Sequence, residues 1–319
     1  MSAGLLALLA AGLVALAGCA SGAGQPSPTP SRTAPPLTGV TLQGKTFTTY
    51  EVPAGSFNVV FDHCTFRGGT ASAAVLTLDR PCHGLTFRDC VIAAGGGWNG
   101  ITINVTNGDF FDVSFVGCRI AGQGRMGFEC TQRPVSDVVG YHAIDLIGCT
   151  FAPQGSEAVS YDGGGGCRDC TISRCLIEGA GDSRAPYGAG LEINGPVGFT
   201  VADTTIWACR DSGFNLNCAA ADCGWVFRND VVDFSHRAQH VPVNADAARL
   251  ILAGGMNGSV WQNCRLVLGD AWNAGYWRSC SSNDLSTSTL SGSPPANQGR
   301  ALWTLDAASR GNKLPAHLG

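Results

Sequence analysis

Three acidic residues, Glu129, Asp162 and Glu192, occupy polar positions in short segments that share one pattern. Most of these segments read Gly, Ala or His, then apolar, polar, apolar and polar residues. Neighbouring carboxyl groups raise one another's pKa, as a general acid requires. Paired acids also cleave glycosidic bonds: carboxyl separations of about 6.5–9.5 Å suit inversion and about 5–5.5 Å suit retention, and both could be reached here. The pattern therefore predicts Glu192 or Glu129 as a general acid with Asp162 as its partner, or alternatively a calcium site.

The other polar positions of these segments are mostly amides. If the segments are neighbouring strands, their polar residues form two columns: Thr102, Glu129, Ser160, Glu192, Asn215 and Pro242, then Asn104, Thr131, Asp162, Asn194, Asn217 and Asn244. Acids, amides and flanking aromatic residues are groups that bind sugars, so we expect a polysaccharide ligand. The candidate ligand-binding residues are Asn104, Asn194, Asn215 and Asn217, with Arg133, Arg168, Arg184 and Tyr187 in bordering loops. The alternative is that the amides stabilise the fold along its axis and the acids are simply solvated.

A second motif, built around cysteine, predicts the elements that position these residues. It reads apolar–x–apolar–x–x–Cys–x–apolar, and the clear copies place cysteine at positions 64, 90, 118, 149, 175 and 264; Thr204 and Asp230 take that place in two further copies. The spacing of about 29 residues is typical of stacked repeats. Alternation of apolar residues within each copy indicates strands.

The alternation slips by one residue immediately before the cysteine position, which indicates a tight corner. The residues at the slip are His63, Asp89, Gly117, Gly148, Arg174, Asp203, Asn229 and Asn263. Most are Gly, Asn or Asp, the residues that tolerate a left-handed backbone. Two strands meeting at a corner, followed by a strand that carries the acids, give at least three strands in each coil of a solenoid.

These repeats resemble the right-handed parallel β-helix of the pectate-lyase-like superfamily, across residues 37–310. The resemblance implies an all-β fold, a single-stranded solenoid of about nine or ten coils. Leu37–Val52 would form the first turn, and the weaker repeats after Leu268 would form further coils or a cap. The superfamily includes polysaccharide lyases, hydrolases, phage tailspikes and adhesins, so the fold does not fix the activity.

Two functions therefore remain open. The first is a surface protein that binds and cleaves or remodels a polysaccharide, as a lyase or a hydrolase. The second is a non-catalytic lipoprotein that binds glycans, adheres to them or shields the envelope, including one of phage origin. The chain lacks the Asp-Asp pair that polygalacturonase-like hydrolases use. Lyases of this fold usually take the proton with Lys or Arg, but the two lysines, Lys45 and Lys313, lie near the ends of the domain.

The chain contains 15 cysteines, and the repeats assign different roles to them. The five from Cys64 to Cys175 in the motif are expected to stack as buried thiols that act as small apolar groups. Cys218 and Cys223 are the best candidates for a disulfide, with Cys82, Cys209 and Cys280 as weaker ones. Cys167-x-x-Cys170 is expected to be structural, because no second pair with matching spacing supports a zinc site.

The N-terminal residues predict export. Residues 1–18 are expected to be a signal peptide, since the apolar core is too short to span a bilayer. Leu16-Ala-Gly-Cys19 resembles the lipobox of bacterial lipoproteins, which implies lipidation of Cys19 and a membrane anchor at the cell surface, although no Lys or Arg precedes the apolar core. Residues 19–36 then form the lipidated cysteine and a flexible tether, and residues 37–319 form the β-helix domain with terminal caps.

The charge of the chain limits its partners. The net charge of −4 argues against a nucleic-acid partner, which would need a basic stripe. The spacing of the histidines and cysteines predicts no metal site. Apart from the calcium alternative at the acids, we therefore predict no cofactor.

Overall fold

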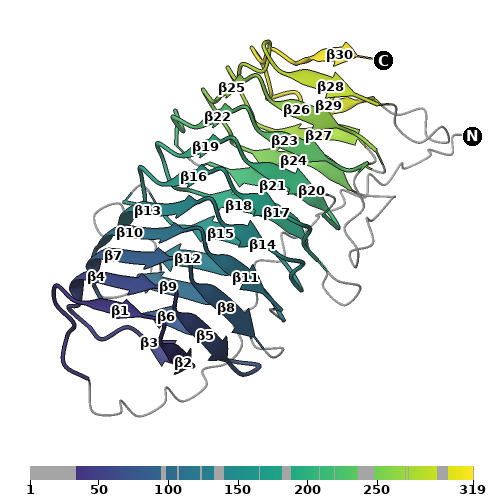
Figure 1. Ribbon diagram of the computed structural model, residues 1–319. Helices are drawn as coiled ribbons and strands as arrows, with labels where there is room; N and C mark the ends of the chain where they lie inside the picture. The colour runs from purple at the N-terminus through teal and green to yellow at the C-terminus, as the bar shows by residue number, and fades with distance from the viewer. Residues whose placement is uncertain are drawn as a thin grey trace, which may run out of the picture. The chain divides into compact units, whose positions relative to one another are not determined.

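The computed structural model describes residues 34–94, 98–105, 108–122, 124–132, 140–164, 166–181, 188–207, 209–218, 220–235, 248–269, 271, 273–292 and 301–318. In these ranges every regular element is a β-strand. They include no helix with the length and apolarity needed to cross a membrane. The strands belong to three parallel sheets, here named A, B and C, which the chain visits in turn (Figure 1).

The strands are given by sheet. Sheet A contains β1 (Thr41–Gln43), β4 (Phe57–Asp62), β7 (His83–Arg88), β10 (Phe110–Val116), β13 (Tyr141–Ile147), β16 (Thr171–Ser173), β19 (Thr200–Ala202), β22 (Val226–Arg228) and β25 (Val260–Gln262). Sheet B contains β2 (Thr46–Thr48), β5 (Thr65–Gly68), β8 (Val91–Ala94), β11 (Arg119–Ala121), β14 (Thr150–Phe151), β17 (Leu176–Ile177), β20 (Thr205–Trp207), β23 (Val231–Asp233), β26 (Arg265–Val267), β28 (Thr289–Ser291) and β30 (Ala316–Leu318). Sheet C contains β3 (Tyr50–Glu51), β6 (Leu76–Leu78), β9 (Ile101–Val105), β12 (Phe128–Gln132), β15 (Val159–Asp162), β18 (Ala189–Asn194), β21 (Ser212–Asn217), β24 (Arg249–Gly254), β27 (Asn273–Arg278) and β29 (Trp303–Leu305).

This arrangement is the right-handed parallel β-helix that the repeats predict. The solenoid has about eight turns, so the nine or ten coils that the sequence predicts are only approximately correct. The predicted first turn supplies β1, β2 and β3, which pair with the next coil. The weaker repeats after Leu268 continue the fold, because β28 pairs with β26 and β29 pairs with β27.

The predicted corner is confirmed at all eight positions. The residues from His63 to Asn263 that precede the cysteine position have φ between 51° and 65°. A left-handed residue at this point turns the chain from sheet A into sheet B in each coil. Gly213, the second residue of β21, has a different reason: a Cβ there would lie 2.4 Å from Val232 Cγ1, so no side chain fits.

The cysteines of the motif form a buried file, which we call the corner file: Cys64, Cys90, Cys118, Cys149, Cys175, Thr204, Asp230 and Cys264. Backbone hydrogen bonds join its members from coil to coil. For example, the Arg119 N–H donates to the Cys90 carbonyl at 2.9 Å, and the Thr150 N–H donates to the Cys118 carbonyl at 2.9 Å. The six cysteines of the file are free and buried. The prediction of stacked interior thiols is therefore confirmed.

The other cysteines divide as follows. Cys218 and Cys223 form the predicted disulfide, whereas Cys82, Cys209 and Cys280 are buried and free, so the weaker bridge candidates were wrong. Cys167 and Cys170 are also free and buried, which fits their expected structural role. Burial raises the pKa of the Cys170 and Cys209 thiols, so both remain protonated at neutral pH.

Phenylalanine side chains form a second inward column, under sheet A. The rings of Phe61, Phe87 and Phe115 stack nearly parallel, with centroids 4.6 Å apart at both steps. All three side chains are fully buried. Because the sheets repeat at the strand spacing, equivalent residues of successive coils meet face to face.

Candidate functional site

The outer face of sheet C carries the two predicted columns. Across β9, β12, β15, β18 and β21, the first column contains Thr102, Glu129, Ser160, Glu192 and Asn215, and the second contains Asn104, Thr131, Asp162, Asn194 and Asn217. Each residue is the register partner of the next. We call these two columns the sheet C face.

The columns end differently from the prediction. The segment 240–244, which was expected to supply Pro242 and Asn244, lies outside the described residues. The strand that pairs with β21 is β24, and it places Leu252 beside Asn215 and Gly254 beside Asn217. Pro242 and Asn244 are therefore not the next members, because a later segment occupies that position.

Glu192 lies inside the first column and is half-buried. Ser160 Oγ donates to Glu192 Oε2 at 3.1 Å, and Asn215 Nδ2 donates to Oε1 at 2.9 Å. Burial raises the pKa of Glu192 to about 7, and the charges of Glu157 and Asp162 add to this effect. A carboxyl group with this pKa carries a proton for part of the time at neutral pH, as a general acid does.

Glu157 is a site residue that the sequence pattern did not identify. It precedes β15, its side chain is buried, and it accepts a hydrogen bond from Ser156 Oγ. Its charge acts on Glu192 more strongly than that of Asp162. Glu157 and Asp162 therefore both act electrostatically on Glu192, and Asp162 lies on the coil between Glu129 and Glu192.

Glu129, the other predicted general acid, is held by neighbouring polar groups. Asn99 Nδ2 donates to Glu129 Oε2 at 2.7 Å, and Arg125 Nη1 lies 3.5 Å from Oε1. Asn99 is fully buried and also donates to Thr102 Oγ1 at 3.0 Å. An acid whose two oxygens face an amide and a guanidinium is suited to fix its neighbours in place.

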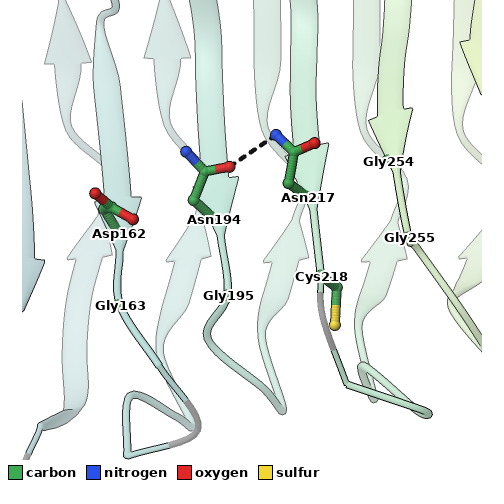
Figure 2. Close-up of a pocket in the computed structure, with 8 residues that line it drawn as sticks. All are labelled: Asp162, Gly163, Asn194, Gly195, Asn217, Cys218, Gly254 and Gly255. Atoms are coloured by element: carbon green, nitrogen blue, oxygen red, sulfur yellow. Dashed lines mark hydrogen bonds between the residues drawn. The ribbon is translucent and has the colours of Figure 1, made fainter. Parts of the chain in front are cut away.

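A shallow pocket of about 350 Å³ lies at the carboxyl ends of β15, β18, β21 and β24. It is lined by Asp162, Gly163, Asn194, Gly195, Asn217, Cys218, Gly254 and Gly255. Figure 2 shows Asp162, Asn194 and Asn217 side by side on successive strands, with Asn217 Nδ2 donating to Asn194 Oδ1 at 2.7 Å. The pocket thus brings together three of the predicted site residues.

Glycine forms much of the pocket lining because there is no room for side chains. Gly195 has φ +92°, and a Cβ there would lie 1.8 Å from the Gly163 carbonyl oxygen. A Cβ at Gly254 would lie 2.7 Å from Asn217 Oδ1. The absence of these side chains leaves the polar ends of the second column open to a ligand.

The second column also extends toward the N-terminus. Asn104 hydrogen-bonds Asp79, which follows β6, and burial raises the pKa of the Asp79 carboxyl. Asp79 was not predicted, since the predicted columns begin at Thr102 and Asn104. Asn104 is thus engaged with an acid of the preceding coil.

At the C-terminal end, the sheet C face becomes basic and aromatic. Tyr276 is the register partner of Leu252, and Arg278 is the partner of Gly254. Arg278 Nε donates to Tyr276 Oη at 2.9 Å. The guanidinium carbons of Arg249 and Arg278 lie 5.3 and 5.1 Å from the centre of the tyrosine ring.

The predicted loop residues have mixed outcomes. Arg168 forms backbone bridges with His142 and Val197 at the approach to sheet A. Its Nε lies 3.6 Å from Asp169 Oδ2. It does not line the pocket. Arg133, Arg184 and Tyr187, like Cys19, lie outside the described residues.

A cation site needs several acidic or histidine side chains close together. In the described ranges, one group of three side chains, Asp62, His63 and Asp89, brings its ligand atoms within 4.8 Å of one another. Asp62 already accepts from Arg88 Nε at 2.9 Å, which lowers its pKa. Glu129, Asp162 and Glu192 do not form such a group.

No known protein family and no curated protein matches the sequence. Among solved structures, the chain is similar to a tailspike protein of E. coli bacteriophage HK620 in complex with pentasaccharide, with a TM-score of 0.48 and 12% identity; the match covers 85% of this chain and 55% of the tailspike. It is also similar to an alginate lyase from Paenibacillus sp. str. FPU-7, with a TM-score of 0.39 and 12% identity over 85% of this chain and 99% of the lyase. The chain thus spans about half the length of the tailspike. Function has to be inferred from the residues of this chain.

Proposed function

We propose that the sheet C face binds an extended polysaccharide. The observation that carries this proposal is the register of five strands, β9 to β21, which aligns acids and amides in two columns. Sugar hydroxyls both donate and accept hydrogen bonds, and carboxylates and amides offer both kinds of partner. The columns repeat these groups at about the strand spacing of 4.8 Å, so a long chain meets several of them.

The pocket supports the same proposal. Asn194 and Asn217 lie at its lining with Asp162, and glycines on either side leave these side chains uncovered. Ligand sites commonly combine a concave surface with a few polar groups that fix orientation. The pocket would hold one or two sugar residues, and the rest of the face would bind the remainder of the chain.

The test is a binding panel with the purified protein. Affinity gel electrophoresis against polygalacturonate, alginate and hydroxyethyl cellulose should show retardation by at least one of them. Asn194→Ala with Asn217→Ala should weaken that retardation, and the matched double change Thr86→Ala with Ser114→Ala on sheet A should not. Absence of binding to any acidic or neutral polysaccharide would contradict the proposal.

A second function, cleavage of the bound glycan, is supported by the half-buried Glu192, which accepts from Ser160 Oγ and Asn215 Nδ2 and whose pKa is raised to about 7 by burial and by the charge of Glu157. In this proposal Glu192 donates a proton to the leaving oxygen, and Glu157 or Asp162 acts as the second acid. Activity should fall above about pH 7 as Glu192 loses its proton. Glu192→Gln should abolish release of reducing ends while binding is kept; release that is unchanged in this variant would exclude the role of Glu192.

Export and anchoring are a separate proposal that rests on the lipobox-like residues around Cys19. We infer a bacterial lipoprotein held at the cell surface by this cysteine. Labelled palmitate fed to the producing cells should appear on the protein, and Cys19→Ser should remove the label and release the protein from the membrane fraction. A membrane-bound, labelled Cys19→Ser variant would contradict lipidation at this residue.

A further inference from the structure

Trp98 stands out on the surface next to the sheet C face. Its relative exposure is 42%, and it is the one aromatic residue among the exposed large apolar side chains of the described ranges. Exposing an indole ring to water has a cost that burial would remove, so an exposed tryptophan next to a polar site indicates a contact surface.

The position of Trp98 is well defined. Its backbone N–H donates to the Thr70 carbonyl at 2.7 Å, and its own carbonyl accepts from the Arg125 N–H at 2.9 Å. The guanidinium carbon of Arg125 lies 4.5 Å from the centre of the ring. Hydrogen bonds to the coils before and after therefore fix the backbone, and Arg125 packs against the ring.

Arg125 also links Trp98 to the first column. Its Nη1 lies 3.5 Å from Glu129 Oε1, and Glu129 Oε2 accepts from the buried Asn99 next to Trp98. The ring, the guanidinium and the carboxylate thus form one contiguous group at β9 and β12. The guanidinium occupies part of the ring surface, and 42% of the residue's surface remains exposed to solvent.

We propose that Trp98, supported by Arg125, is a stacking platform for a sugar ring at the N-terminal end of the sheet C face. This inference rests on the proposed polysaccharide binding. The apolar C–H face of a sugar ring packs on the indole, while the sugar hydroxyls reach Arg125 and Glu129. An aromatic ring flanked by hydrogen-bonding groups meets both the apolar and the polar parts of such a ligand.

The platform makes binding depend on chain length. β9 and β18 are three strand spacings apart, or about 14 Å if the coils are regular. A sugar on Trp98 and one at Glu192 can belong to the same molecule only if that molecule spans this distance. Long chains should therefore gain from Trp98, and short fragments bound at the pocket should not.

The test compares Trp98→Ala and Trp98→Phe with wild type, with Val91→Ala, an exposed apolar residue of sheet B, as the control. The probes are polygalacturonate, alginate and hydroxyethyl cellulose, each as long chains and as disaccharide fragments, in titration calorimetry. For the polymer that binds, Trp98→Ala should weaken the long chain about three- to tenfold, Trp98→Phe should restore most of the affinity, and fragments should bind equally to all variants.

The outcomes separate the two proposals. If wild type binds a polymer and Trp98→Ala binds it equally well, the platform is excluded while the polysaccharide face stands. If Trp98→Ala weakens long chains and fragments alike, the length argument is excluded. If wild type binds none of the three polymers, both the face and the platform are overturned. Matching thermal unfolding midpoints for all variants establish that changes in affinity do not arise from misfolding.

Discussion

The corner file and the sheet C face both consist of equivalent residues stacked on successive coils. They differ in the conditions under which one residue type can replace another. Inside, where oxygen-bearing side chains replace the thiol, each takes up a backbone N–H of the preceding coil: Thr204 Oγ1 accepts from Cys175 N at 3.3 Å, and Asp230 Oδ1 accepts from Thr204 N at 2.9 Å. On the sheet C face, by contrast, Thr, Glu, Ser and Asn all occur at equivalent positions of the first column.

This difference teaches that the inward columns determine stability and the outward columns are free to carry function. A polar atom buried in the corner file finds a hydrogen-bond partner in the next coil, whereas water can serve an exposed outward side chain such as Asn217. Ser288 extends the rule, because its Oγ accepts from the Cys264 N–H at 3.1 Å. The predictions below test this division between the two kinds of column.

The largest effect is expected from the inward phenylalanine column. Phe87→Ala removes a ring that stacks on both neighbours, and it should lower the free energy of unfolding by about 3–5 kcal/mol. Thr86→Ala, the adjacent outward change, should cost less than about 1 kcal/mol. Urea unfolding of both variants measures the contrast, and equal losses would remove the distinction between the columns.

A pH-dependent effect is expected from Asp230. Burial raises its pKa from 3.8 to about 7. Between these pH values the folded protein keeps a proton that the unfolded chain has lost, so this stabilisation is complete below about pH 4 and is lost as the pH rises through about 7. The loss should be on the order of 1–4 kcal/mol.

Asp230→Asn should flatten that slope, because an amide does not titrate. Stability measured at several pH values between 4 and 9 gives the comparison. Stability should also fall with rising pH because of Glu192, whose pKa is raised as well. Comparing Glu192→Gln with the double variant Glu192→Gln and Asp230→Asn therefore isolates the contribution of Asp230. An unchanged slope in Asp230→Asn would show that its carboxyl does not titrate as described.

The disulfide lies where the inside meets the pocket. Cys218 and Cys223 are five positions apart in the sequence, so their bond closes a short loop and should contribute only about 2 kcal/mol. Cys223→Ala should lower the free energy of unfolding by that amount. Reductant should destabilise wild type to the same extent and should leave the variant unaffected; an effect of reductant on both would point to a different cause.

The smallest effect on stability is expected on the sheet C face. Asn217 is exposed, and Asn217→Ala should change the free energy of unfolding by less than about 0.5 kcal/mol. The same change should weaken polysaccharide binding, because its amide lines the pocket. A stable variant with lost binding would sharpen the contrast, whereas a large loss of stability would assign Asn217 to the scaffold.

The sequence predicted the fold well because the scaffold repeats. The corner residues from His63 to Asn263, the corner file and the register of both columns all follow from one recurring pattern. The segment 240–244 was misleading, since it imitates the pattern while β24 begins at Arg249.

The site was only partly predictable. Glu157, Asn99 and Trp98 precede the sheet C strands, where no alternation indicates which way a side chain points. Asp79 lies one residue beyond a recognised segment. The signal that could have found them is proximity in the coil: each lies within a few residues of a position already assigned to the columns.

The strict register has a further consequence for how such a surface can change. Duplication or deletion of one whole coil would move every later partner by a single rung and leave each junction with neighbours of the same kind. The reach of the ligand-binding surface could thus be adjusted in increments of one strand, without redesign of the interior. Insertions inside a strand would shift this register, whereas the turns between strands already differ in length from coil to coil.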